Sequence, residues 1–179
     1  GEVYGANFSD VEKNRWSATA ISYMSEVGIL KGYPDGSFKP TAPITRAEFA
    51  AMAAGFADLK EGEKTFTDLA PTHWAYDVVK KAAAAGWING YPDGSFKADN
   101  PITRAEVVSI TNRMLDRKAD EAFVDGHLSE LITFTDVDKS HWAYYPIAEA
   151  TNGHEFVRDA NKIDEVWKSV THRSFVYDK

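Results

Sequence analysis

Two arginines stand at the same place in two copies of one short motif. Arg46 and Arg104 each follow the threonine of a Thr-Arg-Ala-Glu sequence, and the two copies lie 58 positions apart. A guanidinium group binds a carboxylate through paired hydrogen bonds. The motif also predicts the first turn of a helix, where backbone amides without an intrahelical acceptor favour an anion. These positions therefore indicate a ligand site for an acidic group. A structural arginine that pairs with a carboxylate of a neighbouring repeat would leave the same pattern.

Aspartates and tryptophans recur in the same way and are the other candidate ligand contacts. Asp35 and Asp93 stand in two copies of Gly-Tyr-Pro-Asp-Gly, where Asp is first of all a turn former and only second a ligand contact. Trp16, Trp74 and Trp142 take one place in each of three segments. Core packing is the favoured interpretation of these tryptophans, and a floor for a sugar face is the alternative.

The sequence offers no catalytic constellation, metal site or cofactor motif. Glu48 and Glu106 resemble the two carboxylates of a glycosidase, but a helix cap explains both, and each belongs to a different repeat. His73 and His141 precede a tryptophan at a helix start and lack a second ligand at helical spacing, so we expect caps or surface groups. The turn also lacks the alternating oxygen ligands of a calcium loop. We therefore expect no enzyme, no metal and no cofactor.

Two predicted helices in each repeat must position these residues. The helix after each Thr-Arg-Ala-Glu motif begins with a capping box, in which Thr accepts from the Glu amide and Glu reaches back to the Thr amide. An earlier helix runs from about residue 73 to 85 in the second repeat, and the spacing of Trp74, Val78 and Ala82 predicts its buried face. Gly86 then ends this helix in the left-handed conformation. After the turn, Phe96 is expected to plug the core.

The whole chain divides into repeats. Residues 32–48 align with residues 90–106 without a gap, and a third copy begins at Phe134 and then loses both the turn and an arginine aligned with Arg104. We expect repeat one over residues 1–58, repeat two over 59–124 and a degenerate repeat three over 125–179. Because no repeat can bury its apolar stripe alone, we expect an all-α, mostly helical fold of three helix-turn-helix units around a shared axis.

The bulk composition narrows the function classes. The 179 residues carry a net charge of −7 and no run of Lys and Arg, which argues against nucleic acid and anionic membrane surfaces as partners. No apolar run is long enough to span a bilayer, so we expect no membrane insertion. The absence of cysteine excludes disulfides and thiolate metal sites. No signal peptide is visible and Gly1 reads as a trimmed end, so we expect a fragment of a larger chain.

The repeated motifs resemble the S-layer homology (SLH) domain family. The resemblance rests on Phe-Ser/Thr-Asp, the tryptophan of the first helix, Gly-Tyr-Pro-Asp-Gly-Ser-Phe and Ile-Thr-Arg-Ala-Glu, in two full copies and half of a third. It implies a pseudo-threefold bundle with grooves between the repeats, in a larger extracellular protein at the bacterial cell surface or S-layer. It also implies that Arg46 and Arg104 meet the acidic, often pyruvylated sugar of secondary cell-wall polysaccharide. The third repeat departs from the family pattern, because Arg173 stands one position late.

Alternatives to glycan anchoring stay open on the sequence alone. Some members of that family are thought to bind peptidoglycan decorated with polyamines, and the net charge of −7 favours such a cationic ligand modestly. A module that drives lateral self-assembly of a surface layer, without direct glycan binding, is a second alternative. A hydrolase is the third, and it lacks an acid–base constellation. Non-covalent anchoring of a secreted protein on cell-wall polysaccharide is the function that we expect first.

Overall fold

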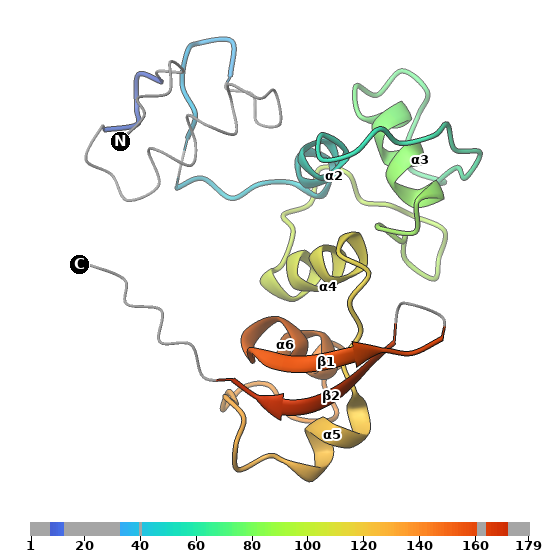
Figure 1. The fold of residues 1–179 in the computed structure, drawn as a ribbon. Helices are drawn as coiled ribbons and strands as arrows, with labels where there is room; N and C mark the ends of the chain where they lie inside the picture. The colour runs from blue at the N-terminus through green and yellow to red at the C-terminus, as the bar shows by residue number, and fades with distance from the viewer. Residues whose placement is uncertain (1–7, 13–32, 40, 161–163, 172–179) are drawn as a thin grey trace. The chain divides into compact units, whose positions relative to one another are not determined.

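The structure of the chain, a computed structural model, describes residues 8–12, 33–39, 41–160 and 164–171 (Figure 1). Trp16 and Arg173, both singled out in the sequence, lie outside these residues. The chain forms two compact units, Gly1–Ile102 and Thr103–Lys179. Among the described residues, no helix has both the length and the apolar character needed to cross a membrane.

The first unit holds helices α2 (Arg46–Ala54) and α3 (Tyr76–Ala84), which pack against each other. Most of the buried side chains on these two helices are small, and they include Ala47, Ala50, Ala53, Val79 and Ala82. Larger apolar groups come from the loop after α3. Phe96 is 0% exposed there, which confirms it as the predicted plug of the core. Its ring lies 5.2 Å from that of Phe66, measured between centroids.

Helix α3 begins later than the sequence predicted and leaves Trp74 outside. Nδ1 of His73 accepts from the amide of Ala75 at 3.1 Å, which makes a turn before the helix. Trp74 stands within that turn and is 64% exposed. The prediction that Trp74 packs in the core is therefore wrong, because a side chain ahead of the first helical turn does not follow the spacing of the buried face. Gly86 has φ of +75°, which confirms the predicted left-handed residue after α3.

Backbone hydrogen bonds join the first two repeats within this unit. The amides of Arg46 and Ala47 donate to the carbonyls of Asn100 and Ala98, each at 2.9 Å. The first turn of a helix leaves its amides without an intrahelical acceptor, and here the second repeat supplies two acceptors. The amino end of α2 is therefore largely occupied by protein atoms.

The second unit combines helices with a β-hairpin (Figure 1). Its elements are α4 (Arg104–Met114), α5 (Glu121–Gly126), α6 (Tyr144–Thr151), β1 (His154–Arg158) and β2 (Glu165–Val170). The strands are antiparallel and pair Val157 with Val166. Helices α4 and α5 each pack against α6. A small core of Val124, Ala148 and Trp167 holds α5, α6 and the hairpin together.

The hairpin stands where a third copy of the helical repeat would continue. Along β2, Glu165 and Trp167 are buried while Val166 and Lys168 are exposed, which is the alternation of a strand with one buried face. The described residues thus combine five helices with one hairpin. The all-α, pseudo-threefold bundle and the repeat boundaries at residues 58 and 124 stay predictions.

Candidate ligand-binding site

Asp93 and Asp35 stabilise the two Gly-Tyr-Pro-Asp-Gly turns through their side chains. Oδ1 of Asp93 accepts from the hydroxyl and the amide of Ser95 at 2.6 and 2.9 Å. Asp35 accepts from the hydroxyl and the amide of Ser37 at 2.6 and 3.0 Å. The bond from the Ser95 hydroxyl, and then that from its amide, lowers the pKa of Asp93. Both residues are confirmed as turn formers, and a ligand contact by either stays a prediction.

One more aspartate in each repeat binds the residues that follow the turn. The repeat alignment pairs Asp68 with Asp10, but the sequence alone indicated no role for either. Asp68 accepts from the amides of Phe96 and Lys97 at 2.7 and 2.8 Å. Burial alone would raise the pKa of Asp68, but these two amides outweigh burial and hold the pKa below its ordinary value. Lys97 has φ of +56°, a left-handed conformation that non-glycine residues rarely adopt. Asp10 makes the equivalent pair of bonds in the first repeat, each at 2.7 Å.

The guanidinium group of Arg46 is enclosed by the second repeat. Its Nε donates to the carbonyl of Phe96 at 2.8 Å, and Nη2 donates to the carbonyl of Asn89 at 3.2 Å. The group lies 4.7 Å from the ring centroid of Tyr91 and 4.8 Å from that of Phe96, within the range of a cation–π contact. Only 5% of Arg46 is exposed. Arg46 therefore joins the two repeats through carbonyls and rings, and its role as a ligand contact stays a prediction.

Arg104 has the same motif and the opposite environment. It is exposed, and it occupies the first position of α4. The capping box behind it is complete, since Thr103 and Glu106 exchange two bonds at 3.2 Å. Within the described residues, its guanidinium makes no hydrogen bond or ion pair, and the amides of Arg104 and Ala105 have no protein acceptor. This end of α4 therefore combines a forked cation with two backbone donors.

Trp74 and Trp142 are exposed in the same local setting. They are 64% and 60% exposed, and each ring stacks with that of the preceding histidine at 5.8 and 5.9 Å between centroids. Nδ1 of His141 accepts from the amide of Ala143 at 3.1 Å, and Nδ1 of His73 accepts from Ala75 in the same way, so each histidine stabilises the turn just before its helix. Core packing is wrong for Trp142 as well, because the indole lies ahead of α6. The sugar-face alternative stays a prediction.

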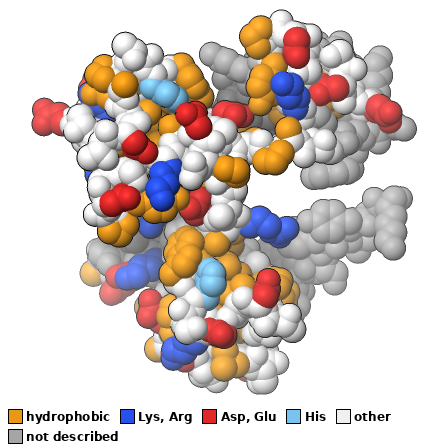
Figure 2. All heavy atoms as spheres, turned by 180° about the vertical axis from the view of Figure 1, so that it is seen from behind, with side chains coloured by type: hydrophobic (Ala, Val, Ile, Leu, Met, Phe, Trp, Pro, Cys, Tyr) orange, Lys and Arg blue, Asp and Glu red, His pale blue; other side chains and the backbone are white. Residues whose placement is uncertain are grey.

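Lys and Arg side chains form no broad basic surface on the face that Figure 2 shows. Lys and Arg side chains there lie singly among acidic and apolar side chains. The net charge of −7 points the same way. Exposed charges further apart than a Debye length of about 8 Å are largely screened at physiological salt. Binding of an acidic ligand would therefore depend on close contacts with individual cations rather than on long-range attraction.

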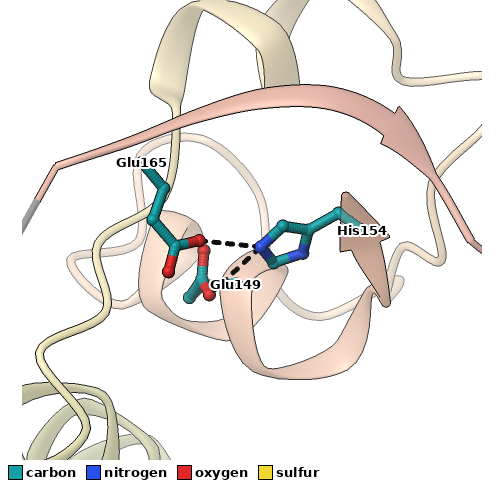
Figure 3. A group of neighbouring side chains, drawn as sticks. All are labelled: Glu149, His154 and Glu165. Carbon is teal, nitrogen blue, oxygen red and sulfur yellow. Dashed lines mark hydrogen bonds and ion pairs between the residues drawn. The ribbon is translucent and has the colours of Figure 1, made fainter. Parts of the chain in front are cut away.

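Sequence patterns missed a buried polar cluster in the second unit. Glu149, His154 and Glu165 converge there from α6, β1 and β2 (Figure 3). They lie in the third copy, where the alignment with the first two copies fails, so no recurrence marks them. Glu165 stands two positions before Trp167, and this strand spacing is a sequence signal that could have placed Glu165 on the buried face of β2.

The comparisons with known proteins indicate the same kind of protein, a cell-surface one with S-layer homology domains. The family model for the S-layer homology domain matches residues 7–50 and 65–108, which contain both Thr-Arg-Ala-Glu motifs. Over 178 residues the chain is 36% identical to cell surface glycoprotein 1 of Acetivibrio thermocellus, covering 90% of this chain and 7% of that protein. The cellulosome-anchoring protein of the same species is 37% identical over 168 residues, covering 90% of this chain and 36% of that protein.

An enzyme also carries a similar segment. The amylopullulanase of Thermoanaerobacterium thermosulfurigenes is 36% identical over 125 residues, covering 65% of this chain and 7% of that protein. The chain thus spans much less than two thirds of each of these relatives. Such coverage compares one segment of each relative with this chain and leaves most of the relative unmatched.

Proposed function

This chain belongs to the S-layer homology domain family, and we propose that it anchors a larger protein non-covalently on acidic polysaccharide of a bacterial cell wall. Its place is the cell surface, in keeping with relatives named as a cell surface glycoprotein and a cellulosome-anchoring protein. The segment similar to this chain makes up only 7% of the amylopullulanase, so the enzyme name refers to that whole protein. The chain itself is a non-catalytic module.

The exposed guanidinium of Arg104 is the observation that supports the glycan part of this proposal. A carboxylate placed at the amino end of α4 would receive two parallel bonds from the guanidinium fork. The amides of Arg104 and Ala105 add donors aligned with the positive end of the helix dipole. Thr103 and Glu106 satisfy each other, so the cap holds this end of the helix in place without using those donors.

The equivalent end of α2 has a different task. There the donors of Arg46 and Ala47 bind carbonyls of the second repeat. The stretch of the third copy that aligns with those carbonyls forms the β-hairpin instead. Among the described residues of its own unit, Arg104 therefore has no comparable loop to bind, and we assign it to a ligand. The same motif thus joins two repeats at Arg46 and binds the ligand at Arg104.

An exposed tryptophan suits the sugar part of the ligand. Trp142 belongs to the same unit as Arg104, and its indole is held by the stacked ring of His141. A sugar ring binds an indole through its apolar face, while a carboxylate substituent needs a cation. We assign these two parts of an acidic glycan to Trp142 and Arg104.

A competition experiment tests the charge of the ligand. The chain is sedimented with purified bacterial cell walls in the presence of a free pyruvylated sugar or a free diamine. The proposal expects the sugar to release the chain and the diamine to leave it bound. Release by the diamine alone would favour polyamine-decorated peptidoglycan. Concentration-dependent sheets without wall binding would favour self-assembly.

A further inference from the structure

Three ionisable side chains from three elements meet inside the second unit (Figure 3). Nε2 of His154, on β1, lies 2.8 Å from Oε2 of Glu165, on β2. The same nitrogen lies 3.5 Å from Oε1 of Glu149, on α6. The side chain of His154 is 1% exposed, and those of Glu165 and Glu149 are 0% exposed. Burial of two carboxylates is costly, so a compensating positive charge is required.

The hydrogen bond at the other ring nitrogen determines what Nε2 can do. Nδ1 of His154 lies 2.7 Å from the carbonyl oxygen of Asn152, which can only accept. Nδ1 therefore carries a proton. In the neutral ring Nε2 is then an acceptor that faces two further acceptors, the carboxylates of Glu149 and Glu165. A proton or a metal ion must therefore lie between these atoms, and a proton would sit either on Nε2 or on one of the two carboxyl groups.

Two arginines contact the carboxylates of the cluster. Nη2 of Arg117 lies 2.7 Å from Oε1 of Glu149, and Nη2 of Arg158 lies 3.7 Å from Oε1 of Glu165. Both arginine side chains are about a third exposed, at 31% and 32%, so water screens them. Oε2 of Glu149 is buried and has no hydrogen-bond donor among the described residues. Glu149 thus keeps one buried carboxylate oxygen without a donor, and a bound metal ion would supply the missing partner.

We propose that Glu149, His154 and Glu165 bind one zinc ion. Zinc takes imidazole nitrogen and carboxylate oxygen at about 2.0–2.2 Å in tetrahedral sites, which places neighbouring ligand atoms about 3.3 Å apart. The ligand atoms here lie within 4.8 Å of one another, and the two distances to Nε2 bracket that value. Small side-chain movements therefore complete the site, with water as a fourth ligand.

The surroundings of His154 are those of a positioned metal ligand. A ligating histidine usually donates its other ring N–H to a carbonyl or carboxylate, which fixes the ring and raises its basicity. Here Nδ1 of His154 donates to the carbonyl oxygen of Asn152. The imidazole also stacks on Trp167 with 3.7 Å between centroids and 13° between planes. The ion would tie α6 to both strands, in the repeat whose sequence departs furthest from the other two. This structural role is independent of glycan binding.

Thermal unfolding with defined metal contents tests the proposal. The whole chain is stripped with a chelator, dialysed, and titrated at pH 7.5 with zinc chloride, with magnesium chloride as the control metal. We expect one bound zinc per chain by elemental analysis. At zinc about 100-fold above its Kd, the melting temperature of the second unit should rise by roughly 10 °C. Magnesium, which avoids imidazole ligands, should produce no such rise.

Matched variants locate the ion. Glu165→Gln and His154→Gln should lose the bound zinc and the rise in melting temperature. Two control variants should keep the ion. Glu155→Gln changes an exposed carboxylate on β1, the strand of His154, and His73→Gln changes a histidine of the first unit. The zinc titration of the wild-type chain tests the proposal even if a cluster variant fails to fold. Absence of stoichiometric zinc in the wild type would overturn the proposal, and a proton on Nε2 or on one of the two carboxyl groups would then take the place of the ion. Zinc retained by folded Glu165→Gln would overturn it as well.

Discussion

Nε of Arg46 donates to the carbonyl oxygen of Phe96 at 2.8 Å, across 50 positions of the chain. This bond joins the start of a helix in the first repeat to the core plug of the second. Arg104 follows the same motif and forms no such bond within the described residues. Variants of Arg46 therefore test how the first two repeats are held together, and variants of Arg104 test ligand binding.

Replacement of Arg46 should weaken the fold of the first unit. Arg46→Ala removes a donor from the buried carbonyl of Phe96 and from the part-buried carbonyl of Asn89, and it removes a cation from two aromatic rings. We expect a loss of about 2–4 kcal/mol in the free energy of unfolding, measured with urea. Arg46→Lys should recover only part of it, because an ammonium group cannot reproduce the planar fork. Unchanged stability in Arg46→Ala would contradict the role of Arg46 as a tie.

Removal of Asp68 should release the loop that follows the second turn. Asp68→Ala leaves the amides of Phe96 and Lys97 without their acceptor, and Lys97 then holds its left-handed conformation without support. A cost of about 1–3 kcal/mol is expected from urea unfolding. Asp99→Ala is the control, since this exposed carboxylate in the same loop has only a distant contact, 3.5 Å, with His73. Equal effects of the two variants would remove the special role given to Asp68.

Acid should destabilise the first unit through the same aspartates. The pKa of Asp68 and that of Asp93 are lowered in the folded chain. Their contribution is therefore fully present above the unfolded-state pKa of about 4 and is lost as the pH falls through the lower folded values. Melting temperatures recorded from pH 7 to pH 2 should drop mainly below pH 4. The drop should be shallower in Asp68→Asn, and an identical profile in that variant would argue against the assignment.

The exposed tryptophans should affect binding more than stability. Because Trp74 and Trp142 keep 64% and 60% of their surface in solvent, truncation of either to alanine removes little buried area. We expect stability to change by less than about 1 kcal/mol. Affinity for purified wall polysaccharide should fall in Trp142→Ala, as measured by calorimetry. A folded Trp142→Ala chain with wild-type affinity would remove the indole from the proposed site.

Local sequence chemistry predicted much of this structure correctly. The capping box of Thr103 and Glu106, the left-handed Gly86 and the buried Phe96 depend on contacts that a repeat makes within itself. Their residue types therefore indicate them directly. The same is true of the turn bonds made by Asp35 and Asp93.

The environments of Arg46 and Arg104 could not be predicted from the motif. Each depends on the repeat that follows, which is a complete copy after Arg46 and a β-hairpin after Arg104. Trp74 was misplaced because helical spacing was extended beyond the true start of α3. The cluster around His154 brings together three residues of the degenerate third copy that no recurrence marks, so only the tertiary fold reveals it.

Wall affinity of Arg104→Ala is the most direct test of the central claim, that an exposed guanidinium at the start of α4 grips an acidic glycan. Co-sedimentation with purified cell walls should show at least a tenfold weaker Kd, or about 1.4 kcal/mol, with an unchanged melting temperature. Arg113→Ala, which removes the same charge from the other end of α4, should bind as the wild type does. Wild-type affinity in a folded Arg104→Ala chain would contradict the account.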